Sequence, residues 1–153
     1  MKKSGFTLLE IAVVTIILGL LGTLGTLAIM KAVQNARIKN TEAELEILSA
    51  AVLQLAWDTG EWPNGQPRNN GGSTEIWDIS GSSSGLLDTD GSYNHWKGPY
   101  YDGALEDQWG NSYFFDPDYL IGGVNHVVIG SFGPNGRGPN LYDSDDIYVL
   151  LDD

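Results

Sequence analysis

A single carboxylate lies inside the most apolar stretch of this chain. Glu10 follows a short polar leader that contains Lys2 and Lys3, and apolar residues continue beyond it to Met30. A charge placed in hydrocarbon costs roughly 3 kcal/mol or more, so such a residue is usually functional. We therefore predict that Glu10 meets a positive partner once the helix is packed in an assembly. The alternative is an ordinary polar residue at the level of the lipid headgroups.

A second group of oxygen-bearing side chains lies near the C-terminus, around a loop rich in Gly and Pro. Its members are Asn135, Asp143, Asp145 and Asp146. Calcium takes about six to eight oxygen ligands in flexible geometry, which such residues could supply. The spacing is not that of an EF-hand, so the residues alone favour a solvated acidic loop. A further oxygen-rich set has less support, because it lacks the glycine of an EF-hand loop: Asp88, Asp90 and Ser92.

The other patterns do not indicate catalysis. Residues 81–85 match G-x-S-x-G, but they lie in a serine-rich loop rather than between a strand and a helix. His95 and His126 are scattered and are expected to be packing or surface residues. The chain has no cysteine, which excludes disulfides, zinc–thiolate sites and thiol catalysis. Without a phosphate-binding loop, we predict a protein that is not an enzyme and that takes energy from another protein.

The formal net charge of −12 is unevenly distributed along the chain. Residues 1–39 carry five basic side chains against Glu10 alone. The remaining residues carry three basic side chains against nineteen acids, which is 20 minus Glu10. Nucleic-acid backbones are bound through Lys and Arg, so the acidic part is not expected to bind them. Its charge predicts exposure to water or cation binding.

The apolar stretch of residues 6–30 is 25 residues long, and a bilayer needs about 20. A secretory signal peptide is the rival interpretation. The run is too long for one, the leader is too short, and no small-residue cleavage site closes the run. Lys2 and Lys3 predict a cytoplasmic N-terminus under the positive-inside rule. The basic residues on the other flank oppose this orientation: Lys31, Arg37 and Lys39.

The helix is predicted to continue beyond the apolar stretch. Apolar residues at spacings of seven, three, four and three define one helical face: Ile38, Leu45, Leu48, Val52 and Leu55. Three acids are expected mostly on the opposite face: Glu42, Glu44 and Glu46. A stop signal at 58–60, Asp-Thr-Gly, predicts a helix from about Phe6 to about Trp57, close to 75 Å long.

The rest of the chain predicts loops and a small sheet. Residues 60–112 are rich in Gly, Ser, Asn, Asp and Trp without periodicity, which indicates a long loop around the helix. β-rich runs at 112–116, 124–130 and 147–151 predict three short antiparallel strands. We therefore predict an α+β fold, in which a long N-terminal helix packs on a small antiparallel sheet with long loops.

Residues 5–10, Gly-Phe-Thr-Leu-Leu-Glu, resemble the processing site of type IV pilin-like proteins. Later blocks resemble the major pseudopilin of type II secretion systems: Trp-Lys-Gly-Pro-Tyr at 96–100, Asp-Gln-Trp-Gly-Asn-Ser-Tyr at 107–113, Ser-Phe-Gly-Pro-Asn-Gly at 131–136 and Asp-Asp-Ile at 145–147. Gln108 and Ser112 stand where that family usually has prolines. Together the resemblance covers most of the chain.

The resemblance implies a processed filament subunit. A membrane peptidase would cut between Gly5 and Phe6, the Phe6 amine would be methylated, and Glu10 would guide assembly. The implied parts are a leader (1–5), a transmembrane and filament-core helix (6–30) and a periplasmic pilin-like domain (31–153) that includes the amphipathic helix (about 31–57).

The resemblance also reverses the interpretation of the C-terminal acids, because major pseudopilins typically bind calcium in the matching loop. It implies one structural calcium ion, in place of a disulfide, with Asn135, Asp143, Asp145 and Asp146 as candidate ligands. Asn135 stands where an aspartate is common in the family.

The function implied is a major pseudopilin that polymerises into a periplasmic filament and drives protein export. The partners implied are copies of the chain itself, the prepilin peptidase and methylase, the assembly platform with its cytoplasmic ATPase, minor pseudopilins, and the bacterial inner membrane before assembly. The first alternative is a type IV pilin for adhesion, motility or DNA uptake. The second is a membrane-anchored periplasmic domain that never polymerises.

Overall fold

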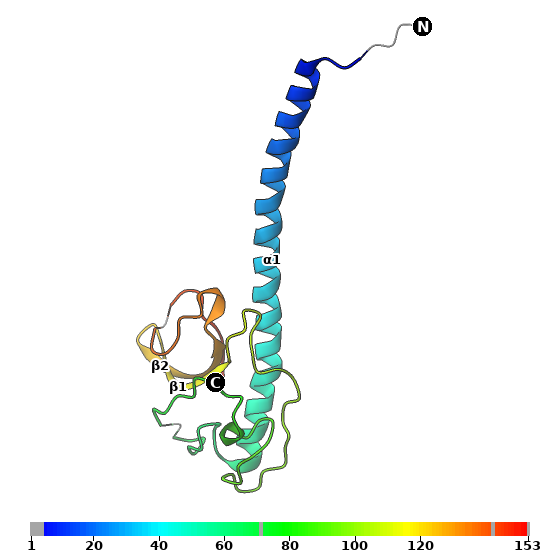
Figure 1. The fold of residues 1–153 in the computed structure, drawn as a ribbon. Helices are drawn as coiled ribbons and strands as arrows, with labels where there is room; N and C mark the ends of the chain where they lie inside the picture. Colours follow the sequence, from blue (N-terminus) through cyan, green and yellow to red (C-terminus); the bar gives the residue numbers. More distant parts are fainter. Residues whose placement is uncertain (1–4, 71, 142, 153) are drawn as a thin grey trace. The chain divides into compact units, whose positions relative to one another are not determined.

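The fold consists of one long helix, three strands and two short 3-10 turns (Figure 1). The computed structural model describes residues 5–70, 72–141 and 143–152. In chain order the elements are α1 (Leu8–Thr59), η1 (Ser82–Ser84), β1 (Phe114–Ile121), β2 (Val124–Ser131), η2 (Gly133–Asn135) and β3 (Ile147–Leu150). The predicted α+β class, a long N-terminal helix with a small antiparallel sheet, is confirmed. The chain divides into two units, Met1–Ala36 and Arg37–Asp153, which are described separately.

In the first unit, α1 is apolar around its whole circumference. Large apolar side chains are exposed on all sides, with Leu8 92% and Leu18 62% accessible. The most apolar 18-residue window of α1 has a mean hydropathy of 2.3. A helix that is apolar all round belongs in a membrane or in the interior of an assembly. Among the described residues, this one helix is long and apolar enough to cross a bilayer.

In the second unit, α1 buries one face. Four residues of the predicted apolar face are fully buried: Leu45, Leu48, Val52 and Leu55. The fifth, Ile38, is half-buried. Glu42 and Glu46 are exposed as expected. Glu44 instead turns toward the domain, where its Oε2 accepts a 2.6 Å hydrogen bond from the Tyr113 hydroxyl. The helix ends at the predicted stop signal, because Gly60 takes a left-handed φ of 81°.

The three strands form one antiparallel sheet in the order β1-β2-β3. Alternate residues of the β1–β2 hairpin point to opposite faces. Phe115 and Ile129 join the core around α1, whereas Phe114 and Val128 pack with Trp77 and Phe132 on the other face. The sequence predicted the first strand at 112–116, but β1 begins at Phe114 and continues to Ile121. A bulge between Asp116 and Tyr119 allows this extension, because it accommodates Pro117, which has no N–H for the ladder.

The loop of residues 60–112 lies around the C-terminal end of α1, as predicted (Figure 1, green). The Tyr93 hydroxyl donates to the carbonyl oxygens of Pro63 at 2.7 Å and Ser83 at 2.9 Å. Lys97 Nζ forms an ion pair of 2.8 Å with Asp58 near the helix end. The loop is therefore fixed by its own side-chain-to-backbone hydrogen bonds and by one ion pair to α1.

Candidate functional site

The first turn of α1 is held by a capping box formed by Thr7 and Glu10. The Thr7 N–H donates to Glu10 Oε2 at 3.0 Å, and the Glu10 N–H donates to Thr7 Oγ1 at 3.3 Å. The Thr7 hydroxyl also donates to Glu10 Oε2 at 3.2 Å. Such reciprocal bonds satisfy N–H groups at the helix start that have no partner within the helix. The sequence contains this signal as T-x-x-E at residues 7–10, which the interpretation of Glu10 as an assembly residue alone does not include.

Gly5 and Phe6, the predicted processing residues, precede α1 in a segment without regular structure. Both are exposed, and the Phe6 side chain is 84% accessible. Glu10 therefore lies one helical turn beyond an accessible Gly–Phe bond. Lys2 and Lys3 fall outside the described residues.

The four predicted C-terminal ligands come together around the Asn135 amide. Asn135 Nδ2 donates to Asp143 Oδ2 at 2.9 Å and also to Asp145 Oδ1. The Asn135 N–H donates to Asp145 Oδ2 at 3.0 Å. Asp146 Oδ2 accepts a long bond of 3.4 Å from the Asp143 N–H. We refer to Asn135, Asp143, Asp145 and Asp146 as the C-terminal acidic loop.

The acids of this loop have different environments. The hydrogen bond from the Asn135 amide is the main cause of the lowered pKa of the Asp143 carboxyl. Burial raises the pKa of Asp146, although its Oδ2 accepts a 2.6 Å bond from the Tyr119 hydroxyl. Asp146 Oδ1 is buried and has no hydrogen-bond partner among the described residues. An unsatisfied carboxylate oxygen beside two other acids is a position that a cation could neutralise.

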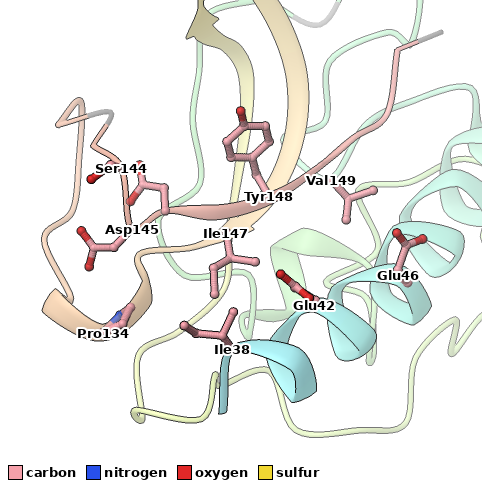
Figure 2. A pocket seen from close by; sticks show the side chains of 10 residues that line it. Ile38, Glu42, Glu46, Pro134, Ser144, Asp145, Ile147, Tyr148 and Val149 are labelled. Carbon is pink, nitrogen blue, oxygen red and sulfur yellow. The ribbon is translucent and has the colours of Figure 1, made fainter. Parts of the chain in front are cut away.

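A groove of about 580 Å³ lies beside this loop, between α1 and β3 (Figure 2). Ile38 on α1 and Ile147 on β3 approach each other from its two sides (Figure 2). Acidic side chains also line the groove: Glu42, Glu46, Asp145 and Asp146. The groove thus combines apolar side chains with negative charge, which suits a partner surface that carries both apolar and basic side chains.

A third group of acids was not predicted from the sequence. Glu75, Asp116 and Asp118 each place one oxygen within 4.8 Å of the others, an arrangement that could hold a metal ion. Asp116 is fully buried, and burial together with Asp118 raises its pKa to about 6. The only sequence signal was Asp-Pro-Asp at 116–118. Nothing in the sequence indicated that Glu75 would lie next to it.

The remaining candidates have structural roles or lie on the surface. The Ser92 N–H donates to Asp90 Oδ1 at 2.9 Å, so this part of the second oxygen-rich set closes a local turn. In the serine-rich loop, Ser83 is exposed, and the buried Ser84 hydroxyl donates to the Ile79 carbonyl at 2.7 Å. His95 is exposed, and His126 lies 3.3 Å from Asp152.

The Asp107 carboxylate connects the Trp-Gly-Asn block to the C-terminal acidic loop. Its Oδ1 accepts from the Trp109 and Asn111 N–H groups, both at 2.9 Å. Its Oδ2 accepts from the Ser131 hydroxyl at 2.6 Å and from Asn111 Nδ2 at 3.2 Å. Asn111 Nδ2 also donates to the Gly133 carbonyl at 3.3 Å. The sequence block identified through the resemblance therefore has a structural role, because Asp107 and Asn111 hold Ser131 and Gly133 in place.

No protein-family model, curated protein or solved structure matches the chain. The fold defines an α+β protein with one helix that could cross a membrane. A more specific function has to be inferred from the residues and contacts described above.

Replacing Asp107 should destabilise the second unit strongly. Asp107→Ala leaves the Ser131 hydroxyl and two backbone N–H groups without their acceptor, at about 1–3 kcal/mol for each buried group. We expect the free energy of unfolding to fall by about 3 kcal/mol or more, measured by urea unfolding of the full chain in detergent with tryptophan fluorescence. Glu106→Ala, at the exposed neighbouring acid, is the control. An Asp107→Ala variant as stable as this control would contradict the assigned role.

Proposed function

We propose that the chain is a filament subunit of the type IV pilin-like class, and specifically a major pseudopilin of type II secretion. The observation that carries the proposal is the first part of α1, which is apolar all round and has one carboxylate in its first turn. Lipid would cover this surface before assembly, and neighbouring α1 helices would cover it in the filament. A plain membrane anchor would use Glu10 only as a helix cap, whereas a filament subunit would also use its charge.

The exposed Gly5–Phe6 segment supports processing by a membrane peptidase. A protease requires an accessible chain without regular structure, and these residues precede the helix. Cleavage between Gly5 and Phe6 would leave a new amine at Phe6, followed directly by Thr7. The capping box uses only Thr7 and Glu10, so the start of α1 would remain intact in the processed subunit.

The capping box leaves Glu10 able to act between subunits. Both side-chain bonds that Glu10 accepts go to Oε2, and among the described residues Oε1 accepts none. The Phe6 amine of a neighbouring subunit would supply the positive partner. Breaking a buried ion pair costs about 3–5 kcal/mol, enough to make the pairing a condition for assembly.

The C-terminal acidic loop supports the proposed structural calcium ion. Among the described residues Asp146 Oδ1 lacks a partner, and the Asn135 amide donates to both Asp143 and Asp145. A half-turn of that amide would present its oxygen instead. Calcium would then bind Asp143, Asp145 and Asp146, with Asn135 Oδ1 as the fourth side-chain ligand, and would hold a loop that no disulfide closes.

The proposed location follows from this assignment. The subunit would cross the bacterial inner membrane once with a cytoplasmic N-terminus, and the second unit would lie in the periplasm. Residues 31–39 carry basic side chains, and the groove is acidic. The basic segment of one copy could therefore face the acidic groove of another copy. Assembly would use the cytoplasmic ATPase machinery and would move exported proteins outward.

Processing should produce a subunit that begins at methylated Phe6. Mass spectrometry of purified filaments, with N-terminal sequencing, measures this directly. Gly5→Val should leave the precursor uncleaved, because a branched side chain replaces the small residue at the scissile bond. Filaments built from subunits that retain residues 1–5 would argue against the pilin-like assignment.

Glu10→Gln should insert into the membrane and be cleaved but should not form ordered filaments. The amide retains an oxygen that can accept the Thr7 bonds, so this variant removes the charge and keeps the cap. Thr7→Ala is the matched control, since it weakens the cap by about 1 kcal/mol and keeps the charge. Filaments are counted by electron microscopy. Normal filaments from Glu10→Gln would show that capping, and not charge, is the role of Glu10.

Calcium should raise the melting temperature of the full chain in detergent relative to chelator. A ligand that binds only the folded state adds about 2.7 kcal/mol at a hundredfold excess over its Kd. Asp143→Asn should reduce this gain, whereas Asp90→Asn, at an acid in a local turn, should not. A calcium effect that is the same in Asp143→Asn and in the unmodified chain would leave the C-terminal acidic loop as a solvated surface.

A further inference from the structure

Backbone pairing brings together three acids that are far apart in the sequence. Ile76 and Phe115 exchange two backbone hydrogen bonds of 2.8 Å, which makes residues 76 and 115 an antiparallel pair. Glu75 is therefore placed opposite Asp116. The bulge that follows, together with a 2.8 Å bond from the Asp118 N–H to Asp116 Oδ1, turns Asp118 back toward the same point. One oxygen of each acid lies within 4.8 Å of the others.

Two carboxylate oxygens in this cluster are buried without a partner. Asp116 has no exposed surface, and its Oδ2 has no hydrogen-bond donor among the described residues. Asp118 Oδ1 is in the same condition. Buried carboxylate oxygens nearly always accept a hydrogen bond, because an oxygen without one costs the full desolvation free energy of a charged group. The fully buried Asp116 has no access to solvent, so its Oδ2 can be satisfied only by a bound cation or by a proton shared with a neighbouring acid.

Within the described residues, no basic side chain supplies a counter-charge to these acids. The ion pairs within the described part of the chain are Lys97–Asp58 and His126–Asp152, and neither involves these three acids. Three negative charges thus converge without a counter-charge in a domain that is already acidic. The C-terminal acidic loop differs, because the Asn135 amide donates to its acids.

We propose that Glu75, Asp116 and Asp118 bind a calcium ion, as a second cation site separate from the C-terminal acidic loop. Carboxylate oxygens select hard divalent cations. Two oxygens that share one calcium ion at about 2.3–2.6 Å can lie up to about 5 Å apart, so a spacing within 4.8 Å is compatible with calcium. Magnesium, at about 2.0–2.1 Å, requires every pair within about 4.2 Å.

The half-buried Glu75 and Asp118 would form the entrance of the site, and the buried Asp116 its base. The ion would tie the loop of residues 60–112 to β1 at the bulge. This connection would add to the contacts that already join the two segments, namely the Ile76–Phe115 pair and the 3.2 Å hydrogen bond from the Ile79 N–H to the Tyr113 carbonyl. The site does not depend on whether the chain forms filaments.

Calcium titration of the full chain, monomeric in detergent and freed of metal with chelator, tests the proposal by isothermal calorimetry. Glu75→Gln and Asp118→Asn should each weaken one binding event at least about tenfold, since even residues that only orient metal ligands matter by about 10–100-fold. That event should persist in Asp143→Asn. Asp78→Asn, at an exposed acid of the same loop, is the matched control and should bind like the unmodified chain.

Circular dichroism establishes that each variant is folded. Glu75 is half-buried, so Glu75→Gln keeps the test valid even if replacement of Asp116 prevents folding. Titrations that are unchanged in both Glu75→Gln and Asp118→Asn would overturn the proposal. Tighter binding of magnesium than of calcium would overturn the choice of ion. The alternative is that the acids share a proton. Two results together would show this: calcium does not change the stability of the unmodified chain, and Asp116→Asn is more stable than the unmodified chain in chelator.

Discussion

The C-terminal half of the chain depends on the hydrogen bonds that the Asp107 carboxylate accepts. It is 6% exposed and accepts four hydrogen bonds, from Trp109, from Ser131 and two from Asn111. The Ser131 hydroxyl in turn accepts from the Gly133 N–H at 2.9 Å, and Gly133 begins η2. One buried charge thus fixes the end of the long loop, the end of β2 and the start of the C-terminal acidic loop. A chain without cysteine closes its loops by such polar contacts.

Comparison of three buried or half-buried acids shows which of them lack hydrogen-bond donors. Asp107 has a donor for both oxygens, so it is complete within the chain. Among the described residues, Asp146 has the Tyr119 hydroxyl for Oδ2 but no donor for Oδ1, and Asp116 has the Asp118 N–H for Oδ1 but no donor for Oδ2. With three basic residues after position 39, the domain cannot pair its acids internally. Carboxylates that lack donors are therefore the positions where divalent ions have the most to contribute.

The sequence predicted the elements well, because periodicity reports local geometry. The buried face of α1 followed from Leu45, Leu48, Val52 and Leu55, and the last two strands lay close to their predicted limits. Long-range contacts were not predictable in the same way. The inward turn of Glu44 toward Tyr113 and the placement of Glu75 opposite Asp116 depend on tertiary pairing. The length of β1 was not predicted either, because the strand continues past Pro117 through a bulge between Asp116 and Tyr119.

The start of α1 shows how Glu10 serves the helix and could also serve the proposed assembly. A carboxylate in the first turn is favoured by the helix dipole and by the N–H groups that lack a partner within the helix. The capping box uses this preference, and it holds Glu10 in one position through Oε2. A side chain that is already ordered loses less entropy when it later binds a partner charge. In the proposed filament, the cap would thus prepare Glu10 for an interaction between subunits, while the apolar surface that follows would supply the driving force for removal from water.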